Sequence, residues 1–428
     1  MTLILDLKTY LLLLVPLASG CTINQDLLTA GEQETTGTTT DPGDPTGEDE
    51  PTGAATDPGD PTGEDEPTGC GETDCPQIYE PSNCLRELAW NGQLIGLTRQ
   101  TVAVDDHETV RTILAHVDPD THALTPFAEG LVGTDSRTMV LGPDGAIYTG
   151  GNKGALFEGD ATPQWLQKYS PEGVLLWSVR PEDNGETVST AVDLALLGDE
   201  LVVIGEEGEL RGRSTASGAL LWELPATDGA RFRDAEVDGE GALHVIASAP
   251  SGSEDMPEPG WSIRKYAADR TLLWEDIELA AEPGGFVGSS GFAFDGAGGL
   301  ILALTQYGSD PKVRDTRLRK YDTMGTEVWT RALPGLEPQE SIDRFYTRPG
   351  GGVIAIGPGL GDDNPSGAVT IAFDPEGALL WVDRQAHPEL SDVRNNAAVI
   401  VDGTVMVSGC GLGPPSSDTT AWMLKLAL

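Results

Sequence analysis

The chain has 428 residues, and its 69 acidic and 26 basic side chains give a net charge of −43 at neutral pH. Binding to phosphate groups requires a basic face, so this composition excludes nucleic acid as a partner and disfavours adsorption to anionic lipid. Residues 22–85 contain 16 acidic and no basic residues, and the rest of the chain still carries −27. The folded part is therefore expected to be acidic in its own right.

Residues 1–20 have the pattern of an export signal. The apolar stretch from Tyr10 to Leu17 is too short to cross a bilayer and has the length of a signal-peptide core. It ends in the sequence LASGC at residues 17–21, which resembles the lipobox of bacterial lipoproteins, with Ala18 where Leu is usual. The resemblance implies that Cys21 is lipidated and becomes the mature N-terminus. An ordinary signal peptide followed by an unrelated Cys is the alternative.

Residues 21–69 are predicted to be a disordered acidic tether between the lipid and the folded domain. Thr, Gly, Pro, Asp and Glu dominate them, and the 14-residue sequence TDPGDPTGEDEPTG occurs twice, at Thr40–Gly53 and Thr56–Gly69. Such a tract has too little apolar surface to offset the entropy of ordering. Calcium binding is the alternative role for its carboxylates, but the D-x-D-x-D-G spacing of EF-type loops is absent.

Residues 70–84 form a cysteine-rich lead-in to the folded domain. With Cys21 assigned to lipid, four cysteines remain in an exported chain, which predicts two disulfides among Cys70, Cys75, Cys84 and Cys410. Three pairings are open, but each complete pairing ties the end of the domain to the lead-in through Cys410. A metal site is the alternative. No His lies beside these cysteines, so we expect no metal.

Two repeated phrases predict that residues 85–428 are all-β and form a single β-propeller of seven four-stranded blades. One phrase, two apolar runs around an Asp or Gly turn, is typical of a hairpin and predicts the first two strands of a blade. It occurs at Leu85–Thr98, Arg137–Gly151, Ala191–Gly205, Phe232–Ala247, Gly291–Thr305, Arg344–Gly357 and Ala397–Gly409. The other, a strand, a polar turn and a strand with Trp, predicts the third and fourth strands. It occurs at Lys168–Trp177, Arg213–Trp222, Lys265–Trp274, Lys320–Trp329 and Ala372–Trp381.

The spacing of these phrases sets the number of blades. The tryptophans recur every 45 to 55 residues, which is the period of propeller blades. Thr112–Phe127 completes the first blade if Phe127 takes the place of Trp, and Ala421–Leu428 predicts only a third strand for the last blade. We therefore expect Pro76–Glu80 to supply the missing fourth strand and close the ring. Six or eight blades are the alternatives.

Other repeated residues are interpreted as packing between blades. Aromatic residues recur near the start of the third strand, at Trp165, Trp261 and Trp422, and sugar stacking is the alternative role for them. Lysines recur at Lys168, Lys265, Lys320 and Lys425. We expect these lysines to pair with acidic turn residues such as Asp322.

The phrase K-Y-D-x-x-G-x-x-x-W at Lys320–Trp329 resembles bacterial propeller repeats of the SBBP type and, more loosely, PQQ-like (quinoprotein) repeats. The resemblance covers about residues 85–428 and implies a propeller fold. Quinoprotein dehydrogenases hold their cofactor with a vicinal Cys–Cys pair, which this chain lacks, so we expect no cofactor. PQQ-like repeats also occur in outer-membrane assembly lipoproteins that bind partner proteins. The duplicated acidic linker is similar to those of myxobacterial surface lipoproteins.

No catalytic motif is recognisable in the sequence. The nucleophile elbow G-x-S-x-G is absent, and the five histidines show no H-E-x-x-H spacing. A metal site of His107, Asp105 and Asp106 is an alternative to their role as solvated loop residues. Long loops on a rigid ring are where binding usually occurs. Their acidic residues, which could attract cations or basic protein surfaces, are Glu254, Asp255, Asp310, Asp362 and Asp363.

These observations favour a non-catalytic lipoprotein of the cell envelope, most simply in the outer membrane or at the cell surface. Its propeller would be a monomeric scaffold that binds a protein or an envelope polysaccharide, anchored to the membrane by lipid. The alternative is an envelope enzyme, a glycan hydrolase or lyase, with an acidic site in the propeller channel. An enzyme predicts closely placed acids with raised pKa values in the channel, and a scaffold predicts a channel lined by small and apolar residues.

Overall fold

The structure, a computed structural model, describes fourteen stretches of the chain. They are residues 77–79, 85–104, 107–153, 164–181, 189–224, 231–248, 260–279, 286–307, 314–333, 336, 340–359, 367–386, 391–412 and 419–428. The export signal, the acidic tether, Cys21, Cys70, Cys75, Cys84 and the loop acids Glu254, Asp255, Asp310, Asp362 and Asp363 lie outside these residues. So do Asp105, Asp106 and the side chains of His107 and Trp422. The predictions made for them stay predictions.

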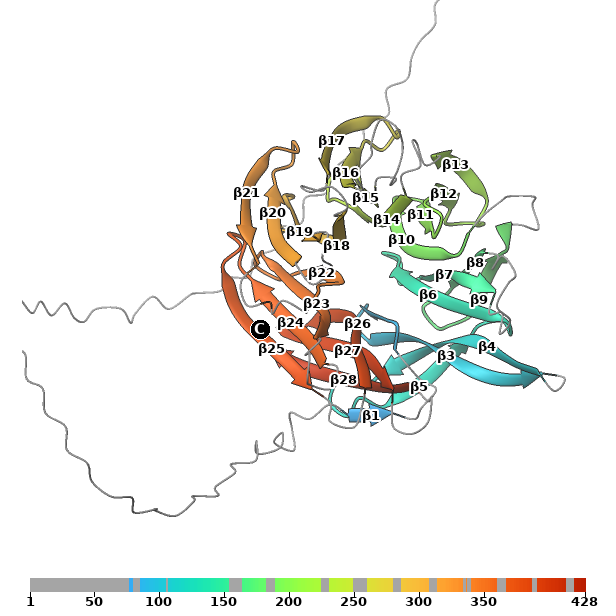
Figure 1. Ribbon diagram of the computed structural model, residues 1–428. Helices are drawn as coiled ribbons and strands as arrows, with labels where there is room; N and C mark the ends of the chain where they lie inside the picture. Colours follow the sequence, from blue (N-terminus) through green and yellow to red (C-terminus); the bar gives the residue numbers. More distant parts are fainter. Residues whose placement is uncertain are drawn as a thin grey trace, which may run out of the picture. The chain divides into compact units, whose positions relative to one another are not determined.

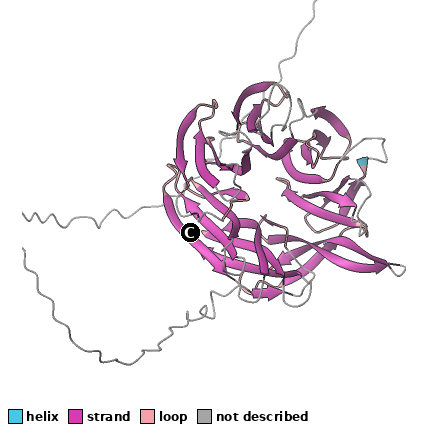
Figure 2. Cartoon of the chain, viewed as in Figure 1, coloured by secondary structure: helices cyan, strands magenta, loops and turns pink. Residues whose placement is uncertain are grey.

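The described residues form seven antiparallel sheets of four strands each, as the repeats predict (Figure 2). Blade 1 consists of β2 (Glu87–Trp90), β3 (Leu94–Val104), β4 (His107–Val117) and β5 (Leu124–Glu129). Blade 2 consists of β6 (Thr134–Leu141), β7 (Ile147–Lys153), β8 (Gln164–Tyr169) and β9 (Leu175–Val179). Blade 3 consists of β10 (Ala191–Leu197), β11 (Glu200–Gly205), β12 (Leu210–Ser214) and β13 (Leu220–Leu224). Each hairpin phrase supplies the first two strands, and Phe127 stands on β5 where later blades have Trp.

Blades 4 to 6 repeat this order. Blade 4 consists of β14 (Arg231–Val237), β15 (Leu243–Ser248), β16 (Gly260–Tyr266) and β17 (Leu272–Leu279). Blade 5 consists of β18 (Phe286–Phe294), β19 (Leu300–Tyr307), β20 (Arg314–Tyr321) and β21 (Glu327–Ala332). Blade 6 consists of β22 (Arg344–Thr347), β23 (Val353–Gly359), β24 (Gly367–Phe373) and β25 (Leu379–Ala386). Among the described residues, no helix has the length and apolar character needed to span a bilayer.

Blade 7 is built from both ends of the domain. It consists of β26 (Ser391–Val401), β27 (Thr404–Leu412), β28 (Thr419–Ala427) and β1 (Gln77–Tyr79). β1 is antiparallel to β28, with Gln77 opposite Met423 and Tyr79 opposite Ala421. The predicted closure by Pro76–Glu80 is therefore confirmed. This pairing covers the backbone groups that would otherwise be exposed along β28.

The hydrophobic core lies between adjacent blades and not within one. Leu88 of blade 1 packs in one cluster with Met406 and Met423 of blade 7, and Leu210 of blade 3 packs in another with Phe232 of blade 4. A single blade has only two faces of alternating side chains, so it can bury its apolar residues only against its neighbours.

A joint between successive blades explains the repeated phrase G-x-x-x-W. The half-buried Trp of a fourth strand lies over the turn between the third and fourth strands of the next blade. A methyl group added at Gly325, where φ is +80°, would lie 2.5 Å from Trp274, and one added at Gly377 would lie 2.5 Å from Trp329. Glycine is needed there because it tolerates positive φ and leaves room for the indole. We call this contact the blade joint.

Blade 4 shows a variant of the joint. Its turn has Arg270 at the positive-φ position, with φ 73°, in place of Gly. The guanidinium carbon of Arg270 lies 4.2 Å from the ring centroid of Trp222 in blade 3. A cation–π contact thus replaces the close approach of glycine to the indole.

The recurring lysines bind within and between blades, but the prediction for Asp322 is wrong. Lys320 forms its ion pair with Asp295, at 2.7 Å, and also donates to the carbonyl oxygen of Pro375 in blade 6, at 3.0 Å. Asp322 instead accepts the backbone N–H groups of Met324 and Thr326 in its own turn. Asp295 caps its own turn in the same way, so capping does not decide the partner: Lys320 pairs with the acid of the β18–β19 turn and not with that of the turn that follows β20.

Candidate functional site

The first strands of the seven blades line the centre of the ring. Each first strand contacts the first strand of the next blade, from β2 to β6 and onward to β26, and β26 contacts β2 (Figure 1). In each blade, one residue of the first strand pairs with the first apolar residue of the second strand. We compare the seven residues that stand three positions before this paired residue. These residues, which we call the inner layer, are Glu87, Thr138, Asp193, Asp234, Gly291, Arg344 and Ala397.

The inner layer differs from blade to blade, whereas the adjacent position does not. The residues that follow the inner layer are all apolar and at most 9% exposed: Leu88, Met139, Leu194, Ala235, Phe292, Phe345 and Ala398. The apolar side chain at that position fills the space between two blades. The inner layer, in contrast, holds two aspartates, a glutamate and an arginine among its seven residues. Packing alone does not explain these charged residues.

A cavity of about 530 Å³ opens onto the inner layer. Blades 2 to 6 contribute to its walls, including the charged side chains of Asp193, Asp234, Glu236 and Arg344 and the ring of Tyr346. This volume lies within the range of about 300–1,000 Å³ found for small-molecule sites. The channel is therefore both wide enough for a ligand and polar.

Asp193 and Asp234 form a carboxyl–carboxylate pair between blades 3 and 4. Their side chains are hydrogen-bonded to each other, and Asp193 Oδ2 also accepts the backbone N–H of Ala235, at 2.9 Å. Burial raises the pKa of both, and that of Asp193 rises furthest because the negative charge of Asp234 adds to the effect. Of the two carboxyl groups, Asp193 is the one whose pKa is raised further.

Glu236 is the third carboxyl of this group. Burial raises its pKa well above the ordinary value, and the charges of Asp234 and Asp193 raise it further. No other described residue forms a hydrogen bond or ion pair with its carboxyl group. Glu236 thus combines a raised pKa with a place in the cavity wall.

Arg344 supplies the positive charge of the inner layer. It forms an ion pair with Glu87. The pair links blade 6 directly to blade 1, although these two blades are not consecutive in the ring. Burial lowers the pKa of Arg344, but the acidic groups around it, Glu87 first and Asp193 among the others, together outweigh this effect, and the net direction is upward. Gly291 lies between Asp234 and Arg344, since a methyl group there would lie 3.2 Å from Asp234 Oδ2 and 3.7 Å from the Cα atom of Arg344, and its φ of +140° is one that side-chain-bearing residues rarely adopt.

A second charged cluster lies in blade 4, and its side chains are buried. Asp238 Oδ2 contacts Lys265 Nζ at 2.9 Å and His244 Nε2 at 3.0 Å, and all three side chains are at most 5% exposed. Burial raises the pKa of Asp238, but hydrogen bonds from Lys265 and His244 outweigh it and lower the value to about 2. The cluster is thus a buried ion pair that holds the blade together.

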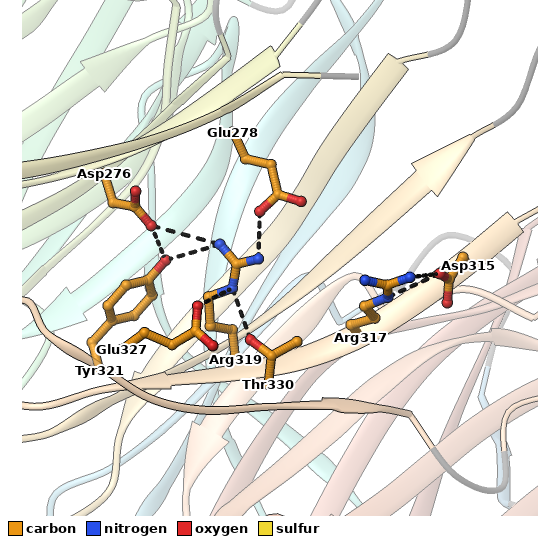
Figure 3. A network of polar contacts seen from close by, with 8 residues as sticks. All are labelled: Asp276, Glu278, Asp315, Arg317, Arg319, Tyr321, Glu327 and Thr330. Carbon is orange, nitrogen blue, oxygen red and sulfur yellow. Dashed lines mark hydrogen bonds and ion pairs between the residues drawn. The ribbon is translucent and has the colours of Figure 1, made fainter. Parts of the chain in front are cut away.

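A third network, shown in Figure 3, lies between the outer strands of blades 4 and 5. Arg319 reaches Glu278 at 2.5 Å and Asp276 at 3.6 Å across the blade boundary, and Glu327 at 3.5 Å within its own blade. One guanidinium therefore neutralises part of three carboxylates. This arrangement ties blades together and leaves no positive charge for an anionic ligand.

The predicted site residues and the observed site do not overlap. The predicted loop acids fall outside the described residues, whereas the acids of the channel come from inside the hairpin phrases. Comparison of the seven phrases at one position would have revealed them, because LRELAW, AVDLAL, FRDAEV and RFYT carry a charge where apolar residues are expected. Among the described residues, no group of three or more His, Cys, Asp or Glu side chains is placed to hold a metal ion.

Comparison with known proteins supports the fold. Residues 136–251, about a quarter of the chain, match the family model described as "Outer membrane protein assembly factor BamB". No curated protein sequence matches the chain significantly. The resemblance to PQQ-like repeats is thus supported over blades 2 and 3 and part of blade 4.

Solved structures of low sequence identity are similar to this chain. A chain of the mitotic checkpoint complex superposes with a TM-score of 0.52 at 11% identity, over 88% of this chain and 97% of that chain. A protein of unknown function from Dyadobacter fermentans gives 0.49 at 12% identity, over 83% and 98%. The WD40 propeller domain of Doa1 gives 0.47 at 12% identity, over 81% and 94%. At this identity the likeness shows the fold alone.

Proposed function

We propose that this protein is a lipid-anchored lipoprotein of the bacterial cell envelope whose propeller is a non-catalytic scaffold for a protein or an envelope polymer. The match of residues 136–251 to the assembly-factor family carries this proposal. A factor that assembles outer-membrane proteins works in the envelope, which agrees with the predicted export signal and lipobox. Lipidation of Cys21, transport to the outer membrane and a disulfide between Cys410 and the lead-in are parts of the same proposal.

The outer strands supply a surface suited to protein contacts. In blades 2 to 6 one or both of the two residues before the Trp of the fourth strand are apolar and between 37% and 55% exposed: Leu175, Leu176, Leu220, Leu221, Leu272, Leu273, Val328, Leu379 and Leu380. Each of these strands is also the edge of its sheet. Exposed apolar side chains along an unpaired edge are the features of an interaction surface.

Two exposed residues within the matched region provide the test. Chemical cross-linking in intact envelopes should capture partner proteins with the wild type. We expect the double variant Leu176→Ser/Leu221→Ser to fold normally but no longer to capture these proteins. Met324→Ser, at a residue that is 77% exposed but lies in a turn, is the matched control. Capture that is unchanged in the double variant, or equally reduced in the control, would overturn the role of the outer strands.

The anchor and the disulfide need separate measurements. We expect Cys21→Ala to abolish incorporation of labelled palmitate and to release the protein from the membrane fraction. Peptide mapping without reduction should yield a peptide that joins Cys410 to Cys70, Cys75 or Cys84. A Cys21→Ala variant that remains membrane-bound would refute the lipid anchor.

The acids of the channel favour a second candidate, an envelope hydrolase or lyase for glycans. Asp193, Asp234 and Glu236 have raised pKa values and lie at a cavity, which is what an enzyme of this fold requires. In this candidate Glu236 would donate a proton to the leaving group. Cleavage of any oligosaccharide in a panel by the wild type, lost in Glu236→Gln, would establish this candidate. No cleavage by the wild type would reject it.

A further inference from the structure

A second cavity lies where the first strands of blades 1 to 3 turn into their second strands. Its volume is about 740 Å³. Its lining combines an indole, aliphatic side chains, prolines, an amide and a carboxylate, contributed by Trp90, Asn91, Leu141, Pro143, Asp144, Pro171 and Leu196. The inner layer and its charged groups do not contribute to this cavity, and Leu196 is the one lining residue that it shares with the first cavity.

Trp90 is unusual for its position. The equivalent residues, which pair with the first apolar residue of the second strand, are Trp90, Leu141, Leu196, Val237, Phe294, Thr347 and Ile400. Only blade 1 places an indole there, and 38% of Trp90 is exposed. The repeated tryptophans belong to the fourth strands and pack in the blade joints. Packing between blades therefore does not account for Trp90.

The two polar side chains of this cavity keep hydrogen-bonding capacity for a ligand. Asp144 Oδ1 accepts the backbone N–H of Ala146, at 3.1 Å, and Asn91 Oδ1 accepts that of Gln93, at 3.2 Å. These bonds hold both side chains in place within their turns. Asp144 Oδ2 and the amide group of Asn91 have no hydrogen bond to any described residue, so one can accept and the other can donate.

We propose that this cavity binds an uncharged glycan, with a sugar ring on the face of Trp90 and hydroxyl groups on Asp144 and Asn91. The face of an indole is negative and attracts the polarised C–H groups of a sugar ring. A carboxylate accepts hydrogen bonds from two adjacent hydroxyl groups, and an amide donates one. A polyanionic glycan is excluded by Asp144 and by the net negative charge of the domain.

The proposal rests on the binding role proposed above and names the polymer class for one site. Calorimetry of the full chain with xylohexaose, cellohexaose and tetra-N-acetylchitotetraose tests it, with an alginate oligosaccharide as the charged comparison. We expect the wild type to bind at least one neutral probe and not alginate. Trp90→Ala should weaken that binding at least tenfold, Asp144→Asn should weaken it severalfold, and Trp90→Phe should retain part of it.

Matched controls separate this site from the outer strands. Leu380→Ala, which removes an exposed apolar side chain from blade 6, a blade that does not line the cavity, should leave the affinity for the probe unchanged. Thermal unfolding of Trp90→Ala verifies that the variant folds. Absence of binding by the wild type to all three neutral probes, or unchanged affinity in Trp90→Ala, would overturn the proposal. The capture of proteins through the outer strands could still stand in that case, so the two failures are distinguishable.

Discussion

Asp234 and Asp238 lie four residues apart in blade 4, and their pKa values are shifted in opposite directions. Burial raises the pKa of Asp234 in the inner layer, where its nearest partner is another carboxyl group. Asp238 has its pKa lowered to about 2 because Lys265 and His244 donate to it. The difference shows that proximity in sequence does not set the chemistry of a carboxyl group. Its partners do, and the partners come from other strands and blades.

The same contrast separates the repeated and unrepeated parts of the domain. Residues that recur from blade to blade, such as Trp274 and Gly325 in the blade joint, have packing partners that also recur. The inner layer does not recur, and it is where like charges are brought together. We therefore expect the repeated residues to increase the free energy of unfolding and the charged residues of the inner layer to reduce it.

The largest effect is expected at the buried ion pair. Asp238→Asn should reduce the free energy of unfolding at pH 7 by about 3 kcal/mol, because it leaves the charge of Lys265 buried without its partner. The folded pKa is lowered, so the wild-type contribution is present above about pH 4 and is lost as the pH falls toward 2. The variant and the wild type should therefore converge over that window in chemical denaturation.

An exposed pair provides the control for this prediction. Lys425 and Asp120 lie 3.2 Å apart, and the side chain of Asp120 is 83% exposed. Asp120→Asn should change the unfolding free energy by less than about 0.5 kcal/mol. Equal losses in Asp238→Asn and Asp120→Asn would contradict the distinction between the buried and the exposed pair.

The blade joint should give the next largest effect. Gly325→Ala should cost about 2–3 kcal/mol, since it adds backbone strain at positive φ and a methyl group 2.5 Å from Trp274. Gly403→Ala is the matched control, because Gly403 has a similar φ of +76° but no atom within 4 Å of the added methyl group. It should cost about 1 kcal/mol. Equal costs in urea denaturation would show that the joint contributes nothing beyond backbone conformation.

The smallest effect, with the opposite sign, is expected in the inner layer. Asp193→Asn imitates the protonated side chain and keeps an oxygen for the N–H of Ala235. The folded pKa of Asp193 is raised, so its stability contribution is present below about pH 4 and decreases as the pH rises. The variant should match the wild type near pH 4 and gain about 1 kcal/mol relative to it by neutral pH. A variant less stable than the wild type at pH 7 would instead show that the ionised pair stabilises the ring.

The sequence by itself determined the fold because the fold is repetitive. Two local phrases repeat with one period, and each specifies two strands through turn residues and alternating apolar residues. Even the closure by Pro76–Glu80 followed from counting strands, since an incomplete blade leaves only one strand to be supplied. The role of Trp165 and Trp261 in packing was also predictable, and both are at most 8% exposed.

Only the tertiary structure decided where the chemistry lies. Asp193, Asp234 and Arg344 stand in three different blades, and nothing local in their strands says that they share one channel. Their pKa values and ion pairs depend on distances across the ring, which the chain sets only when it closes. The partner of Lys320 was mispredicted for the same reason, because Asp295 is 25 residues away in sequence and comes within 2.7 Å of Lys320 only in the folded blade. Local patterns fix elements, whereas long-range contacts fix the electrostatics of a site.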